Sequence, residues 1–363
     1  MHQKDLRASN SKKFPMTEIT TELSQKIRNV GFVCACLVVA VHISHPTSGS
    51  GQWLDMVLAG GLSKVAVPIF FAISGFLLAG KMTESGWWKR EVLKRVRSLV
   101  VPFYCWSFIA FAVATVETVI VARFHGATLR SVTANVFNNG VPWLSVLGLN
   151  LTSMPSVGAL WYVRNLVFFV LLSPLLFKWV KRCGYVGIVF LYVLYLVWTS
   201  FVVPWLPADV RGFFNYGFSI HGMVWFLFGA AIRLSPPPQL SAWMVAPFLC
   251  FGVVAWLISK CNLDVSIIRA AESVEVVALA GALWMTVPSG KWPGWMVSSA
   301  FPIFLMHGMF IGILQMNPSR IPGTGTVFGF LIHWLVPIGV SIVVALLLRC
   351  LCPRFSSLIF GGR

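Results

Sequence analysis

The side chains with the clearest chemical potential lie in apolar surroundings. His42 ends an apolar run that starts at Val30, and Arg164 and His307 lie within later apolar runs. An ionisable group inside an apolar span is costly, so it either packs against a polar partner or has a function. A neutral imidazole can act as a general base toward a hydroxyl group. His42 is therefore a candidate catalytic base, and a histidine hydrogen-bonded between helices is the structural alternative.

Helical rise gives the expected depths of these groups. His42 follows Arg28 by 14 residues and Arg164 precedes Lys178 by 14 residues. Each is then ~21 Å above the inner surface at about 1.5 Å per residue. The two side chains are predicted to meet in the outer half of a membrane, where a buried arginine favours the neutral form of the histidine. The alternative partner of Arg164 is Glu117.

His307 is predicted at a shallower depth. It follows Ser298 by nine residues, which corresponds to ~13 Å of helix. A polar group that packs between helices is the preferred interpretation for this histidine.

Ser74 and Gly75 are two small residues in a second apolar run. Because neither has bulk, another backbone or a thin ligand can come close. Ordinary helix packing is the alternative. A nucleophilic Ser74–His42 pair is not favoured, because Ser74 is only seven residues from Lys81 and therefore lies below His42 in depth.

A basic segment, Lys89–Arg97, follows this run. Arg90, Lys94 and Arg97 recur at helical spacing and share one face, and Glu91 can pair with Arg95 one turn later. Such a stripe either contacts lipid headgroups or holds the phosphates of a nucleotide. Physical chemistry alone slightly favours the lipid interpretation.

Composition places these residues in a membrane protein. The 363-residue chain is 57% hydrophobic and 11% charged, whereas soluble domains have about 25% charged residues. Repeated apolar runs near 20 residues match the thickness of a bilayer, and the absence of bulk water there requires helices. The predicted fold is an all-α, polytopic helix bundle. Ten spans are expected: Val30–Ser44, Val65–Ala79, Ser98–Val121, Gly158–Trp179, Gly184–Val203, His221–Arg233, Ala242–Ser259, Ala270–Val287, Ser298–Met316 and Thr326–Leu351.

The distribution of charge orients this bundle. With ten spans, 20 of the 28 lysines and arginines fall on one side, which the positive-inside rule makes cytoplasmic. The net charge of +17 is then explained by basic inner loops rather than by a nucleic-acid partner, and a phosphate-bearing ligand is the second possibility. The expected organisation is a cytoplasmic segment over residues 1–29, a transmembrane domain over 30–352 and a cytoplasmic tail over 353–363. No cysteine spacing indicates a metal site or a disulfide framework.

Several stretches together resemble the integral-membrane acyltransferase-3 family, whose members O-acylate bacterial surface glycans. They occur in family order over nearly the whole chain. They are Leu37–His42 (LVVAVH), Val67–Leu77 (VPIFFAISGFL), Lys94–Phe103 (KRVRSLVVPF), Leu160–Leu166 (LWYVRNL), Ser173–Leu176 (SPLL) and Ala300–His307 (AFPIFLMH).

The resemblance implies a multi-pass enzyme of the bacterial inner membrane. It implies acyl-CoA, most commonly acetyl-CoA, as a cytoplasmic donor substrate, with no permanently bound cofactor. The acceptor is expected to be a glycan or lipid-linked sugar. His42 maps onto the family's catalytic base. The donor-phosphate contacts map onto four basic residues, Arg90, Lys94, Arg95 and Arg97. One departure is clear, because Gly31 stands where relatives have an arginine, and Arg28 is the nearest substitute.

The expected mechanism threads the pantetheine arm of the donor past Ser74 and Gly75 toward His42. Arg164, Tyr162 or Asn165 offsets the oxyanion charge. Trp161 and His307 are candidate supporting residues.

Two alternatives stay open. A transporter or flippase would use His42, Arg164 and His307 along a polar path, although the chain lacks the repeats and paired broken helices typical of that class. A non-catalytic partner in glycan assembly is the other.

Overall fold

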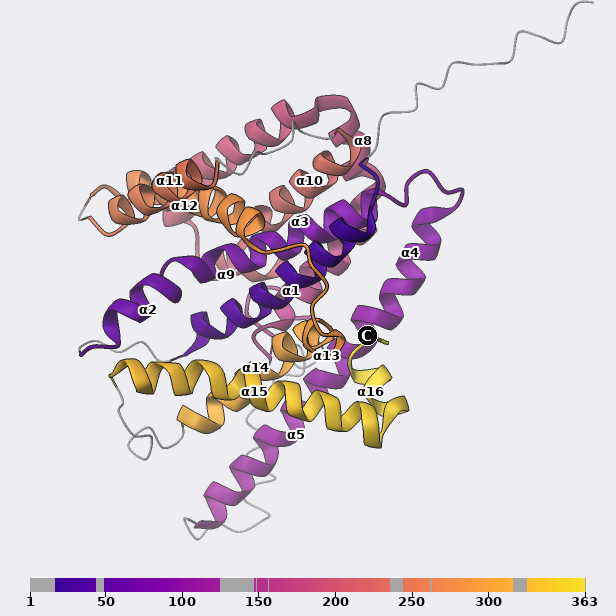
Figure 1. Ribbon diagram of the computed structural model, residues 1–363, viewed down its shortest axis with the longest axis vertical. Helices are drawn as coiled ribbons and strands as arrows, with labels where there is room; N and C mark the ends of the chain where they lie inside the picture. The colour runs from indigo at the N-terminus through magenta and orange to yellow at the C-terminus, as the bar shows by residue number, and fades with distance from the viewer. Residues whose placement is uncertain are drawn as a thin grey trace, which may run out of the picture.

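The computed structural model describes residues 17–43, 49–124, 147, 149–155, 157–235, 244–261, 263–315 and 325–362. Within these ranges the regular elements are all helices (Figure 1). The longer ones are α1 (Thr21–His42), α3 (Ala66–Ala79), α5 (Val101–Phe124), α8 (Leu160–Val197), α10 (Ile220–Leu234), α11 (Val245–Ser259), α12 (Val265–Thr286), α14 (Ala300–Gln315) and α15 (Val327–Leu351). The shorter ones include α2 (Gln52–Leu58), η1 (Leu62–Val65), α4 (Trp87–Arg95), η2 (Val96–Val100), η3 (Trp198–Val202), η4 (Val203–Trp205), α9 (Ala208–Gly212), η5 (Phe213–Gly217), α13 (Gly294–Ser298) and α16 (Pro353–Ile359).

The all-helical prediction is confirmed for the described residues. Six helical stretches in them are long and apolar enough to cross a membrane. They are Thr21–His42, Gln52–Ala79, Trp87–Val113, Leu160–Trp205, Ala208–Leu234 and Val327–Leu351. Each of the ten predicted ranges overlaps a helix, but the count of ten and the cytoplasmic termini stay predictions. The fourth and fifth ranges share α8, whose backbone breaks at Gly184 with φ 56° and ψ −148°.

The directions of three helices define two ends of the bundle. α3 and α10 run the same way, because Gly222 lies against Phe71 near their starts and Gly80 lies against Arg233 near their ends. α1 runs the opposite way, since the Thr17 backbone N–H donates to the Arg233 carbonyl at 3.0 Å. We call these the His42 end, where α1 stops and α3, α8 and α10 begin, and the Gly80 end. In Figure 1, α2 precedes the start of α3 at the left and α4 follows its end at the right.

Gly75 is the point of closest approach between α3 and α10. A Cβ added at Gly75 would overlap the Phe226 carbonyl oxygen, and a Cβ added at Gly229 would overlap that of Ala72. Small residues allow helix backbones to approach in this way. The helix-packing interpretation of Gly75 is therefore the one that its surroundings support, because the open side of this residue is occupied by α10.

The C-terminal residues, predicted as a cytoplasmic tail, include a helix packed on the protein. The Trp106 indole N–H donates to the Ile359 carbonyl at 3.0 Å, and Phe360 is fully buried. Gly361 has φ +67° and lies against the Ser98 carbonyl, where a side chain would clash. This contact attaches the end of the chain to the start of α5.

Two glycine substitutions test this packing. Gly31→Ala should stabilise the protein by up to about 1 kcal/mol, because alanine is the better helix former and nothing lies within 4 Å of a Cβ there. Gly75→Ala should destabilise it by about 1–3 kcal/mol or more, because the new methyl overlaps α10. Thermal unfolding of the detergent-solubilised variants measures both, and a Gly75→Ala variant as stable as Gly31→Ala would contradict this packing.

Candidate active site

His42 lies beside His307 at the His42 end. The two ring centroids are 5.1 Å apart and the ring planes are 32° from parallel. His42 is the last residue of α1 and is exposed, whereas His307 on α14 is 2% exposed. His307 Nδ1 lies 3.0 Å from the Ile303 carbonyl oxygen. Because a carbonyl only accepts, Nδ1 carries the hydrogen, and Nε2 of the neutral ring is an acceptor. A buried acceptor thus lies next to an exposed imidazole.

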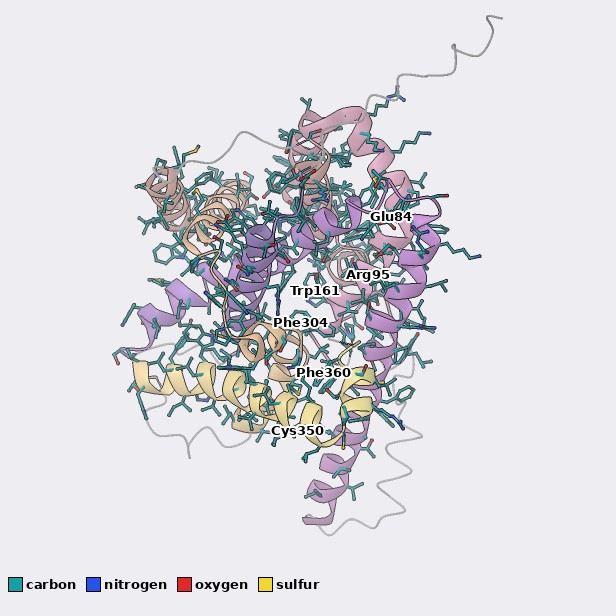
Figure 2. The ribbon with its side chains drawn as sticks, turned by 45° about the vertical axis from the view of Figure 1, so that its right-hand side comes forward. Glu84, Arg95, Trp161, Phe304, Cys350 and Phe360 are labelled. Atoms are coloured by element: carbon teal, nitrogen blue, oxygen red, sulfur yellow. The ribbon has the colours of Figure 1, made fainter. Side chains whose placement is uncertain are left out.

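Aromatic rings continue from this histidine pair into the bundle. The Phe304 ring is 6.3 Å from His307 and 5.4 Å from Tyr162. The Tyr162 hydroxyl lies 3.1 Å from Ser74 Oγ and donates to the Phe70 carbonyl at 3.3 Å. Ser74 thus contacts Tyr162, and Tyr162 is linked to His307 through the Phe304 ring. The side of α3 that carries Ser74 therefore faces Tyr162. In Figure 2, Trp161 and Phe304 are both labelled near the middle of the view.

Arg164 contacts backbone carbonyls. Its guanidinium donates to Asn150 at 2.7 Å, to Ser153 at 3.1 Å and to Tyr216 at 2.9 Å. The side chain is 6% exposed, and these acceptors offset the cost of burying its charge. The predicted encounter of Arg164 with His42 stays a prediction. These contacts favour a role in holding the chain before α8 and α10.

Asn165, like Arg164, hydrogen-bonds to the backbone near the starts of α8 and α10. Its Nδ2 donates to the Trp161 and Tyr216 carbonyls, both at 2.9 Å, and its Oδ1 accepts from the Ser219 N–H at 2.6 Å. The residue is fully buried. Arg164 and Asn165 together attach the start of α10 to the first turns of α8.

The shared face predicted for the basic segment stays a prediction, because Arg97 lies in η2, a π-helix, whereas Arg90 and Lys94 lie in α4. Arg90, Lys94 and Arg97 are exposed, and the predicted Glu91–Arg95 pair is confirmed at 3.7 Å. Arg90 also pairs with Glu84 at 2.8 Å. Hydrogen bonds from Lys81 and then from Arg90 hold the pKa of Glu84 below its usual value. This links the segment to the turn after α3, at the Gly80 end (Glu84 and Arg95, Figure 2).

Arg28 lies on α1, 14 residues before His42. Its side chain is exposed, and the neighbouring Gly31 has open space beside it. About 21 Å of helix separates Arg28 from His42. Arg28 is therefore distant from the histidine pair along α1.

Sequence reasoning missed His221 and two acidic residues. His221 Nε2 accepts from the Trp225 indole N–H at 2.9 Å, and its ring stacks on Tyr195 at 5.2 Å. Lys64 lies 3.0 Å from Glu272 and 3.5 Å from Glu275, both on α12. The rule that ionisable groups inside apolar spans need partners would have selected both glutamates, since they fall inside the predicted Ala270–Val287 span.

Comparison with known proteins identifies the family of the chain. A family model described as an acyltransferase domain, of the acyltransferase-3 type, matches residues 30–350. The chain belongs to the acyltransferase-3 family. This acyltransferase is also 25% identical over 329 residues to a protein of Rhizobium meliloti (strain 1021) named succinoglycan biosynthesis protein ExoH. The match covers 87% of this chain and 84% of the relative. No solved structure matches the acyltransferase significantly.

Asn165 gives a test of the architecture around the site. Asn165→Ala should lower the free energy of unfolding by about 2–4 kcal/mol, because it leaves the buried Ser219 N–H and Tyr216 carbonyl with fewer partners. Thermal unfolding by fluorescence-detected size exclusion measures the change. Thr199→Ala, which removes one local hydrogen bond to Leu196, is the control. An Asn165→Ala variant with the stability of this control would contradict the role given to Asn165.

Proposed function

We propose that this acyltransferase moves an acyl group from cytoplasmic acyl-CoA, most simply acetyl-CoA, to a hydroxyl of a periplasmic or membrane-linked glycan. One observation carries the proposal, namely that an exposed imidazole, His42, lies against a buried imidazole that can accept a hydrogen bond. Family membership supplies the reaction class. The relative named for succinoglycan biosynthesis supports a polysaccharide acceptor. The bacterial inner membrane follows as the proposed location.

In the proposed reaction, His42 is the general base. A ring nitrogen of His42 takes the proton of the acceptor hydroxyl as its oxygen attacks the thioester carbonyl carbon. The tetrahedral intermediate then expels the thiolate of CoA, which receives the proton back from His42. The products are an ester and free CoA, and the base is regenerated. His307 stabilises the transient imidazolium through its Nε2 acceptor.

Tyr162 is the proposed donor to the oxyanion. Its hydroxyl lies beside Ser74 and is linked to His307 through Phe304. The Tyr162 hydroxyl donates to the Phe70 carbonyl in a long bond of 3.3 Å, and its hydrogen turns from that carbonyl to the oxyanion as the charge forms. Arg164 and Asn165 are less suited, because each holds backbone groups through three hydrogen bonds of 2.6–3.1 Å. A single preorganised donor of this kind is worth about 10²–10³ in kcat.

The donor nucleotide is proposed to lie on the face formed by Arg90, Lys94 and Arg97. This face follows the Gly80 end of α3, whereas His42 lies at the other end of a 22-residue helix. At about 1.5 Å per residue that helix is ~33 Å long, so the extended arm of acyl-CoA must run along the bundle. The Ser74 side of α3 is the proposed route, since α10 covers the Gly75 side.

His42→Ala should abolish acyl transfer from labelled acetyl-CoA, by about 10²–10⁴-fold or more, because the general base is lost. The purified variant in lipid nanodiscs should keep the wild-type elution profile. Transfer at the wild-type rate would eliminate this mechanism. A wild-type protein that neither transfers nor hydrolyses the label would instead favour a transporter.

His307→Ala should lower kcat about tenfold or more, and His307→Gln should recover part of it, because a side-chain carbonyl can accept the same bond. His333 is a matched control. Like His307 on α14, His333 on α15 is buried, and its Nδ1 lies 2.8 Å from the carbonyl oxygen four residues earlier. Equal losses in His307→Ala and His333→Ala would show that both act only through packing.

Reversing the charges of Arg90, Lys94 and Arg97 to glutamate should raise the KM for acetyl-CoA at least tenfold while kcat changes little. A matched control reverses Lys178, Lys181 and Arg182, which are exposed on α8. An unchanged KM would assign the first set to lipid headgroups.

A further inference from the structure

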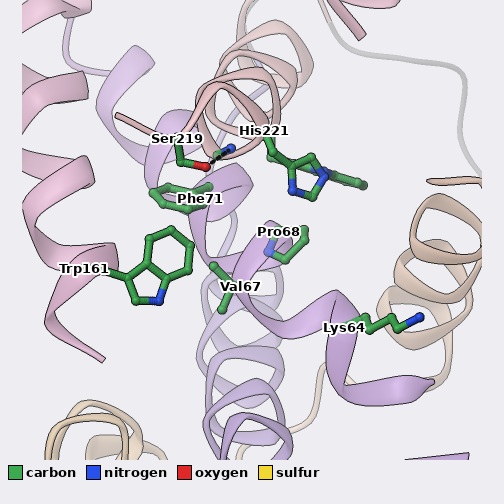
Figure 3. A pocket seen from close by; sticks show the side chains of 9 residues that line it. Lys64, Val67, Pro68, Phe71, Trp161, Ser219 and His221 are labelled. Carbon is green, nitrogen blue, oxygen red and sulfur yellow. Dashed lines mark hydrogen bonds between the residues drawn. The ribbon is translucent and has the colours of Figure 1, made fainter. Parts of the chain in front are cut away.

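A hollow of about 180 Å³ lies at the His42 end between α3, α8 and α10. Aromatic and apolar walls come from Phe71, Trp161, Trp225, Val67 and Pro68. Polar lining comes from Lys64, Ser219 and His221 (Figure 3). Convergent polar groups in a mainly apolar concave site are the usual mark of small-molecule recognition. None of the mechanism above uses this hollow.

The polar lining offers hydrogen-bond donors. Ser219 Oγ accepts from the Gly222 N–H at 3.1 Å, so its own hydrogen remains to be given. His221 Nε2 already accepts from Trp225, which leaves an N–H at Nδ1 of the neutral ring. Lys64 uses one N–H on each of two glutamates and has a third. A ligand rich in acceptor oxygens would satisfy all three.

The charges around the hollow already pair with one another. Lys64 is the one cation among the described residues that line it, and it already pairs with both Glu272 and Glu275. Glu275 is fully buried, and two further cations lie near these groups, Lys260 by Glu275 and Arg269 by Tyr195. A carboxylate or phosphate entering beside Lys64 would therefore have to displace an existing ion pair. A neutral ligand with hydroxyl groups meets no such penalty.

Size and position exclude the nucleotide part of the acyl donor. Sites for drug-sized ligands are about 300–1,000 Å³, so this hollow fits a single ring and no nucleotide. It also lies at the start of α3, whereas the basic face follows its end after 14 residues. That helix is ~21 Å long at about 1.5 Å per residue.

We propose that this hollow binds one neutral pyranose ring of the acceptor glycan, with Trp161 as the stacking surface. That the sugar belongs to the acceptor rests on the proposed function, whereas the binding of a sugar ring does not. Phe71 contacts Tyr162 at 4.6 Å, and Tyr162 leads through Phe304 to His307. Along this path the rings of Phe71, Tyr162 and Phe304 lie between the hollow and the histidine pair. The bound ring is therefore a neighbour of the sugar that is acylated, and it fixes the position of the chain.

Saturation-transfer NMR on the full chain in nanodiscs tests this. The probes are methyl β-D-glucopyranoside, methyl β-D-galactopyranoside, methyl β-D-glucuronide and S-acetyl-N-acetylcysteamine as a donor-arm mimic. At least one neutral glycoside should bind, and Trp161→Ala should weaken it roughly tenfold, because the apolar sugar face loses its aromatic surface. Trp161→Phe should keep most of the binding. Trp205→Ala is the matched control, since Trp205 is 87% exposed.

Three results would overturn the proposal. They are the absence of neutral-glycoside binding, equal binding in Trp161→Ala and Trp205→Ala, and preferential binding of the glucuronide or the donor-arm mimic at Trp161. His42→Ala separates this proposal from the proposed function, because it should retain glycoside binding. If the wild-type protein binds the glycoside but does not transfer an acyl group, the sugar site is supported and only the proposed reaction is contradicted.

Discussion

The contact between the backbones of α3 and α10 is the constraint on which the other features depend. Glycine on each helix removes the side chains that would separate them, so Gly75 meets Phe226 and Gly229 meets Ala72. Inside a bilayer the hydrophobic effect does not drive helices together, and close packing of small residues has that role. This contact aligns the two helices in parallel. Their starts therefore form one wall of the hollow, and the opposite face of α3 is left for Ser74 and Tyr162.

Buried polar side chains fix the ends of the helices. Arg164 and Asn165 hydrogen-bond to backbone groups outside the regular helices, namely the Asn150 and Tyr216 carbonyls and the Ser219 N–H. Such groups at helix ends have no partner within a helix and need one from elsewhere. A charged group buried for this purpose is as costly as one buried for catalysis. The number and identity of its partners, rather than its burial, indicate which role it has. Arg164 contacts carbonyls, whereas His42 stays exposed beside a second imidazole.

The two ends of the bundle differ in chemistry. The Gly80 end leads into the exposed basic face of α4 and η2, beside which the C-terminal helix packs. The His42 end carries the two histidines, the rings of Phe71, Tyr162 and Phe304, and the hollow. A reaction that joins a charged donor to a neutral acceptor across a membrane requires such a separation, because each substrate approaches from its own side. The proposed reaction and the proposed sugar site share this geometry.

The sequence by itself determined the features that depend on local spacing. Apolar runs gave the helical class, and the helical period gave the Glu91–Arg95 pair. Only the tertiary structure decided which distant residues meet. It placed His307 against His42, assigned Arg164 to backbone carbonyls, filled the side of Gly75 with α10 and packed the C-terminal residues on Trp106. Helical periodicity orders residues along one helix, but the crossing and rotation of neighbouring helices depend on packing over the whole chain.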